Sequence, residues 1–255
     1  MYQGTLSKAS RLLLSAKQTF AKLRSFMGVY TVYWGLTRPY FYLLGILRIF
    51  LKRPESFTFR GKTYQYFRHF YGFTYMNERT VEVPLILERV RSNSARRILE
   101  LGNVLSHYIR CDHDIVDKYE KADGVINEDI VNFKVSRPYD LIVSISTLEH
   151  VGWDEKPRDP RKVLNAFENL TSLLAPGGEL MLTFPLGYNP ELDRSFRENE
   201  LHMTERHYLK RISRDNKWIE VGWDEVRDAK YGEPFGCANA IVIGIIRRDK
   251  NGKLV

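Results

Sequence analysis

The chain has 255 residues, of which 44% are hydrophobic and 27% are charged, a composition that excludes a wholly disordered chain and fits one main folded domain. Its two cysteines, Cys111 and Cys237, lie far apart, which argues against a disulfide-stapled scaffold and favours a reducing compartment. The net charge of +8 resides in residues 1–53, which hold nine basic residues and no acid, whereas the remainder holds 30 basic and 31 acidic residues.

The basic N-terminal segment, residues 1–53, is also apolar. Apolar residues recur there at three- and four-residue steps, at Leu12, Leu13, Ala16, Phe20, Leu23 and Met27. This spacing predicts an amphipathic helix over about 10–27. The aromatic stretch 28–51 is interrupted by Arg38 and Pro39, and the apolar run that follows is shorter than the about 20 residues that a membrane-spanning helix needs. We therefore expect this segment not to span a bilayer.

Two interpretations of residues 1–53 stay open. Basic side chains that meet anionic head groups, together with Leu, Phe, Tyr and Trp at the acyl boundary, are typical of an interfacial membrane anchor. A helical cap on the folded domain, or a dimer interface, would use the same apolar surface. We favour nucleic-acid binding and a secretory signal less, because the basic residues alternate with aliphatic ones and no cleavage site follows a short apolar core.

Residues 54–97 form a short second segment. Polar and apolar residues alternate over 56–67 around Gly61, which predicts a β-hairpin. A helix-like stretch over 85–90 then leads into an apolar run that begins at Ile98.

From residue 98 to residue 255, apolar strands alternate with helical or turn segments, the pattern of a doubly wound, mostly parallel α/β sheet. The expected strands are 98–101, 113–117, 124–129, 139–146, 179–184, 218–221 and 240–246, seven in all, with a helix over about 160–174. We expect one domain here, preceded by the helical and hairpin extension.

Acidic residues stand at or near the ends of the first three expected strands. They are Glu100, Asp117 and Asp129, the last preceded by Glu128. In an open α/β sheet the ligand lies beyond the carboxyl ends of the strands, where a carboxylate after the second strand can hold ribose hydroxyls. This arrangement favours an adenosine-type ligand.

Residues 98–184 resemble the core of the Rossmann-like, class I S-adenosylmethionine-dependent methyltransferases. The resemblance rests on five sequence motifs, which occur in the family's order and spacing: ILELGN, DIVDKYE, NEDI, YDLIVSISTLEHV and LLAPGGELMLTFP. They cover about a third of the chain. The resemblance is nearest to the type 11-like members found beside glycosyltransferases.

The resemblance implies S-adenosyl-L-methionine as cofactor and assigns contacts to it. Glu100 and Gly102 would lie against its methionine half, and the glycine would let the backbone approach. Asp117 would bind the ribose hydroxyls. Asp129, with Glu128, would lie near the adenine amino group.

The first motif departs from the family pattern. Val104 and Ser106 stand where the family commonly has further glycines. Asn103 would help the turn, because Asn tolerates the left-handed conformation. A dinucleotide-dependent dehydrogenase is disfavoured, since the glycine-rich turn that cradles a pyrophosphate is missing. Arg79 would meet the methionine carboxylate.

The resemblance places Ser146 to His150 at the reactive end of the cofactor. Glu149 and His150 are the candidate catalytic pair, with His150 as general base oriented by Asp154 or Glu155. The alternative is that Glu149 and His150 only brace their loop.

Three further patterns carry weaker expectations. The run 111–114 contains metal-ligand residue types, but no second cluster completes a site, so we expect no metal. The loop 187–193 could form a lid over the acceptor. A basic helical face is expected from His202, Arg206, His207, Lys210 and Arg211, either as a phosphate contact or as a solvated face.

Together these patterns predict a cytoplasmic methyltransferase, peripheral at the inner face of the membrane through residues 1–53. Its partner would be a small-molecule or glycan acceptor, methylated on oxygen of a sugar, glycan or lipid-linked glycan precursor. The alternative is a catalytically inactive protein of the same fold that acts as a membrane-associated binding or scaffold protein.

Overall fold

The computed structural model describes residues 55–93 and 96–255. The amphipathic helix and aromatic stretch predicted within residues 1–53 lie outside these ranges. Among the described residues, none of the helices combines the length and hydropathy needed to cross a bilayer.

The described chain begins with the predicted hairpin. Strands β1 (Ser56–Phe59) and β2 (Lys62–Gln65) pair antiparallel, and the turn between them places Gly61 at φ +73°. A 3-10 segment, η2 (Tyr71–Met76), leads into helix α2 (Arg79–Ser92).

Helix α2 begins six residues before the predicted stretch and contains Pro84. Proline has no N–H, so it cannot bond the carbonyl four residues earlier. That carbonyl, of Thr80, instead accepts the N–H of Phe67 at 2.8 Å. The preceding loop therefore satisfies the group that Pro84 leaves open, and the helix continues through it.

The main sheet confirms the predicted fold class with eight strands rather than seven. Its order is β5 (Val125–Ile126), β4 (Asp114–Val116), β3 (Ile98–Leu101), β6 (Tyr139–Ile145), β7 (Leu174–Pro185), β10 (Ala240–Arg247), β8 (Glu205–Arg211) and β9 (Trp218–Val221). The first five strands are parallel to one another. The last three form an antiparallel edge.

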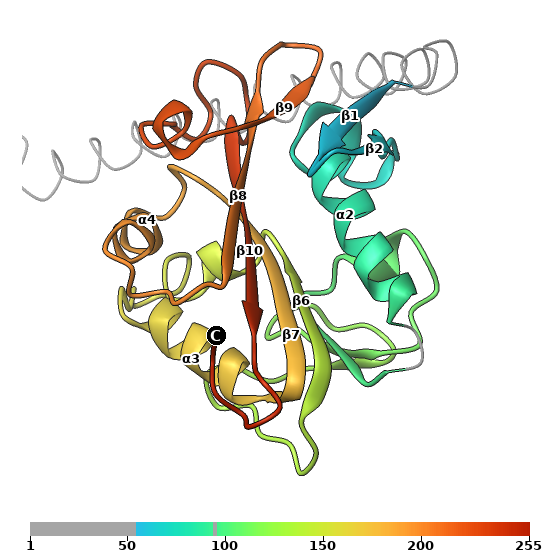
Figure 1. Ribbon diagram of the computed structural model, residues 1–255, viewed down its shortest axis with the longest axis vertical. Helices are drawn as coiled ribbons and strands as arrows, with labels where there is room; N and C mark the ends of the chain where they lie inside the picture. Colours follow the sequence, from blue (N-terminus) through green and yellow to red (C-terminus); the bar gives the residue numbers. More distant parts are fainter. Residues whose placement is uncertain (1–54, 94–95) are drawn as a thin grey trace, which may run out of the picture. The chain divides into compact units, whose positions relative to one another are not determined.

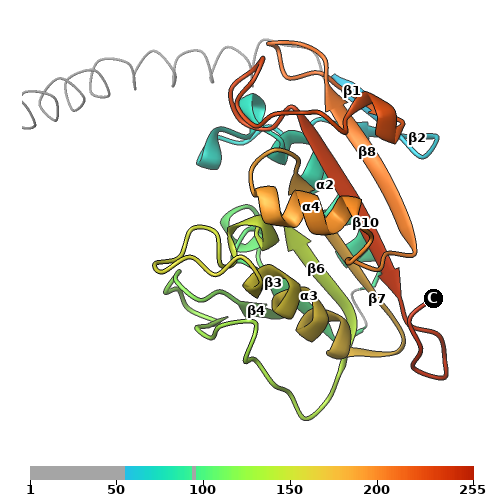
Figure 2. The same ribbon diagram turned by 90° about the vertical axis from the view of Figure 1, so that its left-hand side faces the viewer.

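Helices cover both faces of this sheet. Figure 1 shows α2 on one side and α3 (Lys162–Ser172) and α4 (Pro190–Arg197) on the other; Figure 2 shows α3 and α4 in front of the strands. Two apolar cores result, and neighbouring residues of β3 alternate between them: Leu99 and Leu101 pack with α3 and α4, whereas Ile98 packs with α2. By this alternation Glu100 points to the α2 face.

The strand β8 corrects one prediction. Four of the five residues expected on a basic helical face, Arg206, His207, Lys210 and Arg211, lie instead in this strand between β10 and β9, and the fifth, His202, precedes it. Cross-strand pairs explain its high charge: Arg247 on β10 forms an ion pair with Glu205, and Leu209 is fully buried.

The connections after β3 and β4 are also shorter than a doubly wound fold usually has. A single 3-10 turn, η3 (Leu105–His107), links β3 to β4, and β5 contains two residues rather than the predicted six. Two more 3-10 turns follow, η4 (Leu148–His150) after β6 and η5 (Trp223–Glu225) after β9. The first half of the sheet therefore ends in loops that carry polar side chains.

Candidate functional site

A cavity of about 450 Å³ opens at the carboxyl ends of strands β3, β4, β5 and β6. Seven of the nine predicted site residues line it: Gly102, Asn103, Asp117, Glu128, Asp129, Ser146 and His150. The other two, Glu100 and Glu149, are not among its lining residues. The cavity volume lies within the range of about 300–1,000 Å³ that small-molecule sites occupy.

The cavity lies at the switch point of the sheet. From β3 the chain turns to β4 on one side, whereas β6 pairs with β3 on the other and leads to β7. The loops after β3 and β6 meet where Gly102, at φ +84°, faces Thr147. A Cβ at residue 102 would lie 2.3 Å from Thr147 Oγ1, so this position requires glycine for both its backbone angle and the approach of Thr147.

Glu100 braces the loop that follows β3. Its side chain is fully buried. Oε1 accepts the N–H groups of Val104 and Leu105 at 3.0 and 2.8 Å, and Oε2 lies 2.9 Å from His113 Nε2. The carboxylate thus holds, from behind the cavity, a turn that lacks the family's further glycines.

Asn103 does not adopt the left-handed conformation expected of it; in this loop Gly102 has the positive φ. The backbone N–H of Asn103 donates to Asp117 Oδ2 at 3.1 Å, and the Asn103 side-chain amide donates to Glu120 Oε1 at 2.9 Å. Asn103 therefore ties the loop after β3 to the loop after β4.

Asp117 is fixed by the backbone. Besides the Asn103 N–H on Oδ2, its Oδ1 accepts the N–H groups of Tyr119 and Glu120, both at 2.8 Å. A carboxylate offers about four acceptor positions. Protein N–H groups fill three of them, which leaves one for a ligand of the cavity that Asp117 lines. Asp117→Ala would therefore disturb this loop as well as any ligand contact.

Asp129 is held by two lysines that the sequence did not identify. Its Oδ2 lies 2.9 Å from Lys118 Nζ and 2.6 Å from Lys162 Nζ, and the same two lysines contact Glu155. Although burial opposes ionisation, these contacts hold the pKa of Asp129 below its usual range. Glu155 is thus engaged with lysines rather than with His150, while Glu128 lies exposed at the cavity wall.

Ser146 belongs to a network with α2. Its hydroxyl donates to Glu82 Oε1 at 2.5 Å, and its carbonyl accepts from Arg79 at 3.2 Å. Arg79 also forms an ion pair with Glu82 at 2.7 Å. Arg79 lines the cavity as expected for a carboxylate contact, but a ligand would share it with Glu82.

Glu149 is 2% exposed. Burial raises its pKa well above the usual range, which Arg79 only partly offsets. Among the described residues its Oε2 is one of few buried side-chain atoms that no hydrogen bond satisfies. Because Glu149 is buried and is not among the residues that line the cavity, it is poorly placed to accept a proton from a ligand there.

His150 is paired with Asp154, one of its two predicted partners. Nδ1 lies 2.6 Å from Asp154 Oδ2, and the Tyr188 hydroxyl donates to the same oxygen at 2.7 Å. The ring of Tyr188, in the predicted lid loop, meets the His150 ring edge to face at 4.8 Å between centroids. Nε2 lies 3.7 Å from Glu149 Oε1. With Nδ1 held by Asp154, Nε2 is the ring nitrogen that could take a proton from a ligand, next to the Glu149 carboxyl.

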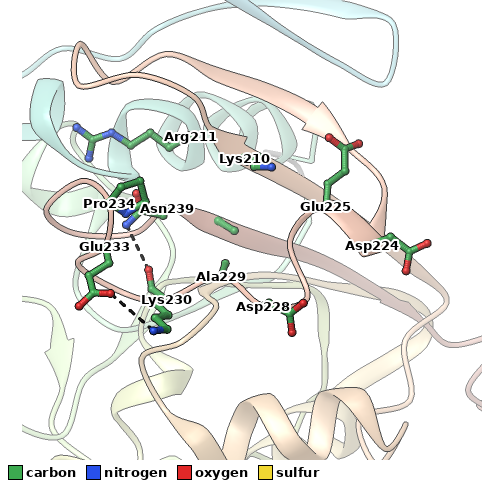
Figure 3. Close-up of a pocket in the computed structure, with 11 residues that line it drawn as sticks. Lys210, Arg211, Asp224, Glu225, Asp228, Ala229, Lys230, Glu233, Pro234 and Asn239 are labelled. Carbon is green, nitrogen blue, oxygen red and sulfur yellow. Dashed lines mark hydrogen bonds and ion pairs between the residues drawn. The ribbon is translucent and has the colours of Figure 1, made fainter.

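A larger hollow, of about 590 Å³, lies near the ends of β8 and β10. Figure 3 shows its charged residues of both signs, with Lys230 in an ion pair with Glu233 and Asn239 bonded to the Lys230 carbonyl. Lys210 and Arg211 of the expected basic face line it beside four acids. This mixed lining gives it no phosphate-binding character.

No family model and no curated protein matches the sequence. Solved structures that resemble it include the N-methyltransferase NodS from Bradyrhizobium japonicum in complex with S-adenosyl-L-homocysteine, at 16% identity over 67% of this chain and 87% of NodS, with a TM-score of 0.41. Another is 1,6-didemethyltoxoflavin-N1-methyltransferase from Burkholderia thailandensis, at 10% identity over 66% of this chain and 79% of that one, with a TM-score of 0.40.

Proposed function

We propose that the protein is an S-adenosylmethionine-dependent methyltransferase. The observation that carries this proposal is the cavity at the switch point of the sheet, with the Asp117 carboxylate held at its wall by three backbone amides. This is the place and the residue type with which open α/β sheets hold a ribose.

The polar residues of the cavity offer contacts for three parts of the cofactor: the ribose, the methionine carboxylate and the adenine. Asp117 has one acceptor position left for a ribose hydroxyl. Glu120, in the same lining, offers a second carboxylate, of which Oε1 already contacts Asn103 and His107. Arg79 supplies a positive charge for the methionine carboxylate. At the adenine end the exposed Glu128 is the better acceptor for an amino group, because Asp129 is occupied by two lysines.

When bound, the sulfonium of S-adenosylmethionine supplies the methyl group. The chain's part is to align the acceptor and to take its proton. His150 Nε2 would accept the proton of an acceptor hydroxyl as the new oxygen–carbon bond forms. Asp154 would hold the ring through Nδ1 and stabilise the imidazolium that results.

We extend the proposal to the acceptor. It would be an oxygen of a sugar, glycan or lipid-linked glycan precursor, reached from the inner face of a membrane. The charge of residues 1–53, nine basic side chains and no acid, supports attraction to an anionic surface. Tyr188 on the loop beside His150 offers an aromatic face of the kind that packs against sugars.

The alternative function is that of an inactive scaffold. Val104 lines the cavity at a position where the family commonly has glycine, and two lysines form ion pairs with Asp129. These features favour a protein that keeps the fold without the chemistry, whereas the ordered His150–Asp154 pair favours the enzyme.

Transfer of a tritiated methyl group from S-adenosylmethionine to membrane-extracted glycolipids and to soluble sugars tests the proposal. We expect label in the glycolipid or sugar fraction with the unaltered chain and with Asp123→Asn, an exposed acid outside the cavity lining. We expect none with His150→Ala. Label that enters only amines would overturn the oxygen acceptor, and label that is unchanged in His150→Ala would overturn the general base.

A further inference from the structure

A second cluster of chemically reactive side chains lies behind the cavity. Glu100 from β3, together with Cys111 and His113 from the connection to β4, each present one ligand atom, and all three atoms lie within 4.8 Å of one another. Residues 111–114 alone do not form a complete metal site, so the sequence predicted none. The third ligand, Glu100, lies on β3, and only the fold brings it next to Cys111 and His113.

The geometry points to a Zn²⁺ site formed by Glu100, Cys111 and His113. Zinc binds thiolate sulfur, imidazole nitrogen and carboxylate oxygen at about 2.0–2.3 Å in tetrahedral geometry, which places ligand atoms about 3.3–3.7 Å apart. His113 Nε2 and Glu100 Oε2 are 2.9 Å apart, so an ion between them would need these two atoms to separate by a few tenths of an ångström. Because no two ligand atoms of the cluster are more than 4.8 Å apart, the half-buried Cys111 would need to move by at most about 1 Å.

Charge also favours a divalent ion. A thiolate and a carboxylate together neutralise Zn²⁺, and a neutral imidazole adds none, so the occupied cluster carries no net charge in a largely buried place. Cysteine binds the ion as a thiolate, so the thiol proton of Cys111 would be released on binding.

A hollow of about 480 Å³ adjoins the cluster and would give access to a fourth coordination position. Cys111 and His113 line it, together with four arginines and two acids: Arg91, Arg96, Arg97, Arg110, Asp112 and Asp114. Three protein ligands with an open position characterise exchangeable or catalytic zinc sites rather than closed structural ones. The arginines would favour water as hydroxide, or another anion, at that position.

The cluster is joined to the loop that borders the cavity. Oε1 of Glu100 accepts the N–H groups of Val104 and Leu105. An ion bound at Oε2 would therefore coordinate the same carboxylate that holds this turn. The ion would thus act on the loop after β3 from the opposite side of β3.

Cobalt substitution tests the site without any need for the cofactor. The untagged full chain is stripped with a chelator and titrated with Co²⁺, and the sulfur-to-cobalt charge-transfer band is recorded. Zinc retained after gel filtration is measured by mass spectrometry. We expect the band and about one zinc per chain, with residual zinc binding more than tenfold weaker in Cys111→Ser and His113→Asn.

Cys237→Ser is the matched control, because Cys237 is the other thiol of the chain and residues 1–54 contain neither Cys nor His. It should keep the band. The result for the unaltered chain decides the outcome even if a variant misfolds. If the unaltered chain shows no sulfur-to-cobalt band, the metal site is overturned, and the Glu100–His113 contact is only a structural hydrogen bond. A band that survives Cys111→Ser, or is lost in Cys237→Ser, overturns the assignment of its ligands.

Discussion

The contact between Gly102 and Thr147 gives a prediction that can be worked out in magnitude. Gly102→Ala places a Cβ 2.3 Å from Thr147 Oγ1 and 2.7 Å from its Cγ2, at a φ of +84°. The left-handed backbone costs alanine about 1 kcal/mol. Overpacking of this kind costs about 1–3 kcal/mol more. We expect the free energy of unfolding to fall by about 2–4 kcal/mol.

Two further variants separate these contributions. Gly124 has a φ of +79°, and a Cβ added there would meet nothing within 4 Å, so Gly124→Ala should lose only the backbone part, about 1 kcal/mol. In the double variant Gly102→Ala with Thr147→Ala, the loss should be smaller than the sum of the single losses by about 1–3 kcal/mol.

Urea unfolding of these variants, of Thr147→Ala alone and of the unaltered chain measures these values. A loss in Gly102→Ala no larger than that in Gly124→Ala would refute the close approach of the two loops. A double variant whose losses simply add would refute it as well. Either result would leave the cavity without the loop contact that shapes its wall.

The remaining predictions concern the acid–base pair, a buried acid and the N-terminal segment. Asp154→Asn should lower kcat about tenfold or more while leaving S-adenosylhomocysteine affinity within about twofold, because it removes the carboxylate that orients His150; an unchanged kcat in steady-state assays would contradict this role. Burial raises the pKa of Asp193 to about 6, above its unfolded value, so its protonation stabilises the fold below about pH 4 and this contribution is lost as the pH rises through 6. Asp193→Asn should therefore gain about 2–3 kcal/mol over the unaltered chain between pH 4 and pH 7 in chemical unfolding, and a pH-independent difference would argue against it. Deletion of residues 1–53 should abolish co-sedimentation with anionic liposomes; retained binding would assign the membrane contact elsewhere.

The parallel half of the sheet was predictable because its strands are apolar on both faces and end in recognisable acids. The residues that follow β3, β4 and β6 line one cavity, at the carboxyl edge of the sheet where the pattern predicted a ligand site. The strand β8 was not predictable in this way, since Glu205 and its neighbours are charged and their partners come from β10 and β9.

The electrostatic state of the site could not be predicted from the sequence. Asp129 meets Lys162, which lies 33 residues away on α3, and Glu100 meets His113 across the turn between two strands. Such pairs depend on which loops the fold brings together, whereas the spacing of acids along the chain depends only on local pattern. Seven of the nine predicted site residues thus line one cavity, whereas the partners of Asp129 and Glu100 were not predicted.

Calorimetric titration with S-adenosylhomocysteine tests the central claim most directly. Asp117→Asn is the informative variant, because the amide can keep the two N–H bonds to its oxygen while removing the charge; Asp123→Asn is the matched control. The proposal predicts a Kd in the micromolar range for the unaltered chain and the control, and binding at least tenfold weaker for Asp117→Asn. No heat of binding at millimolar ligand, or equal affinity in all three proteins, would contradict it.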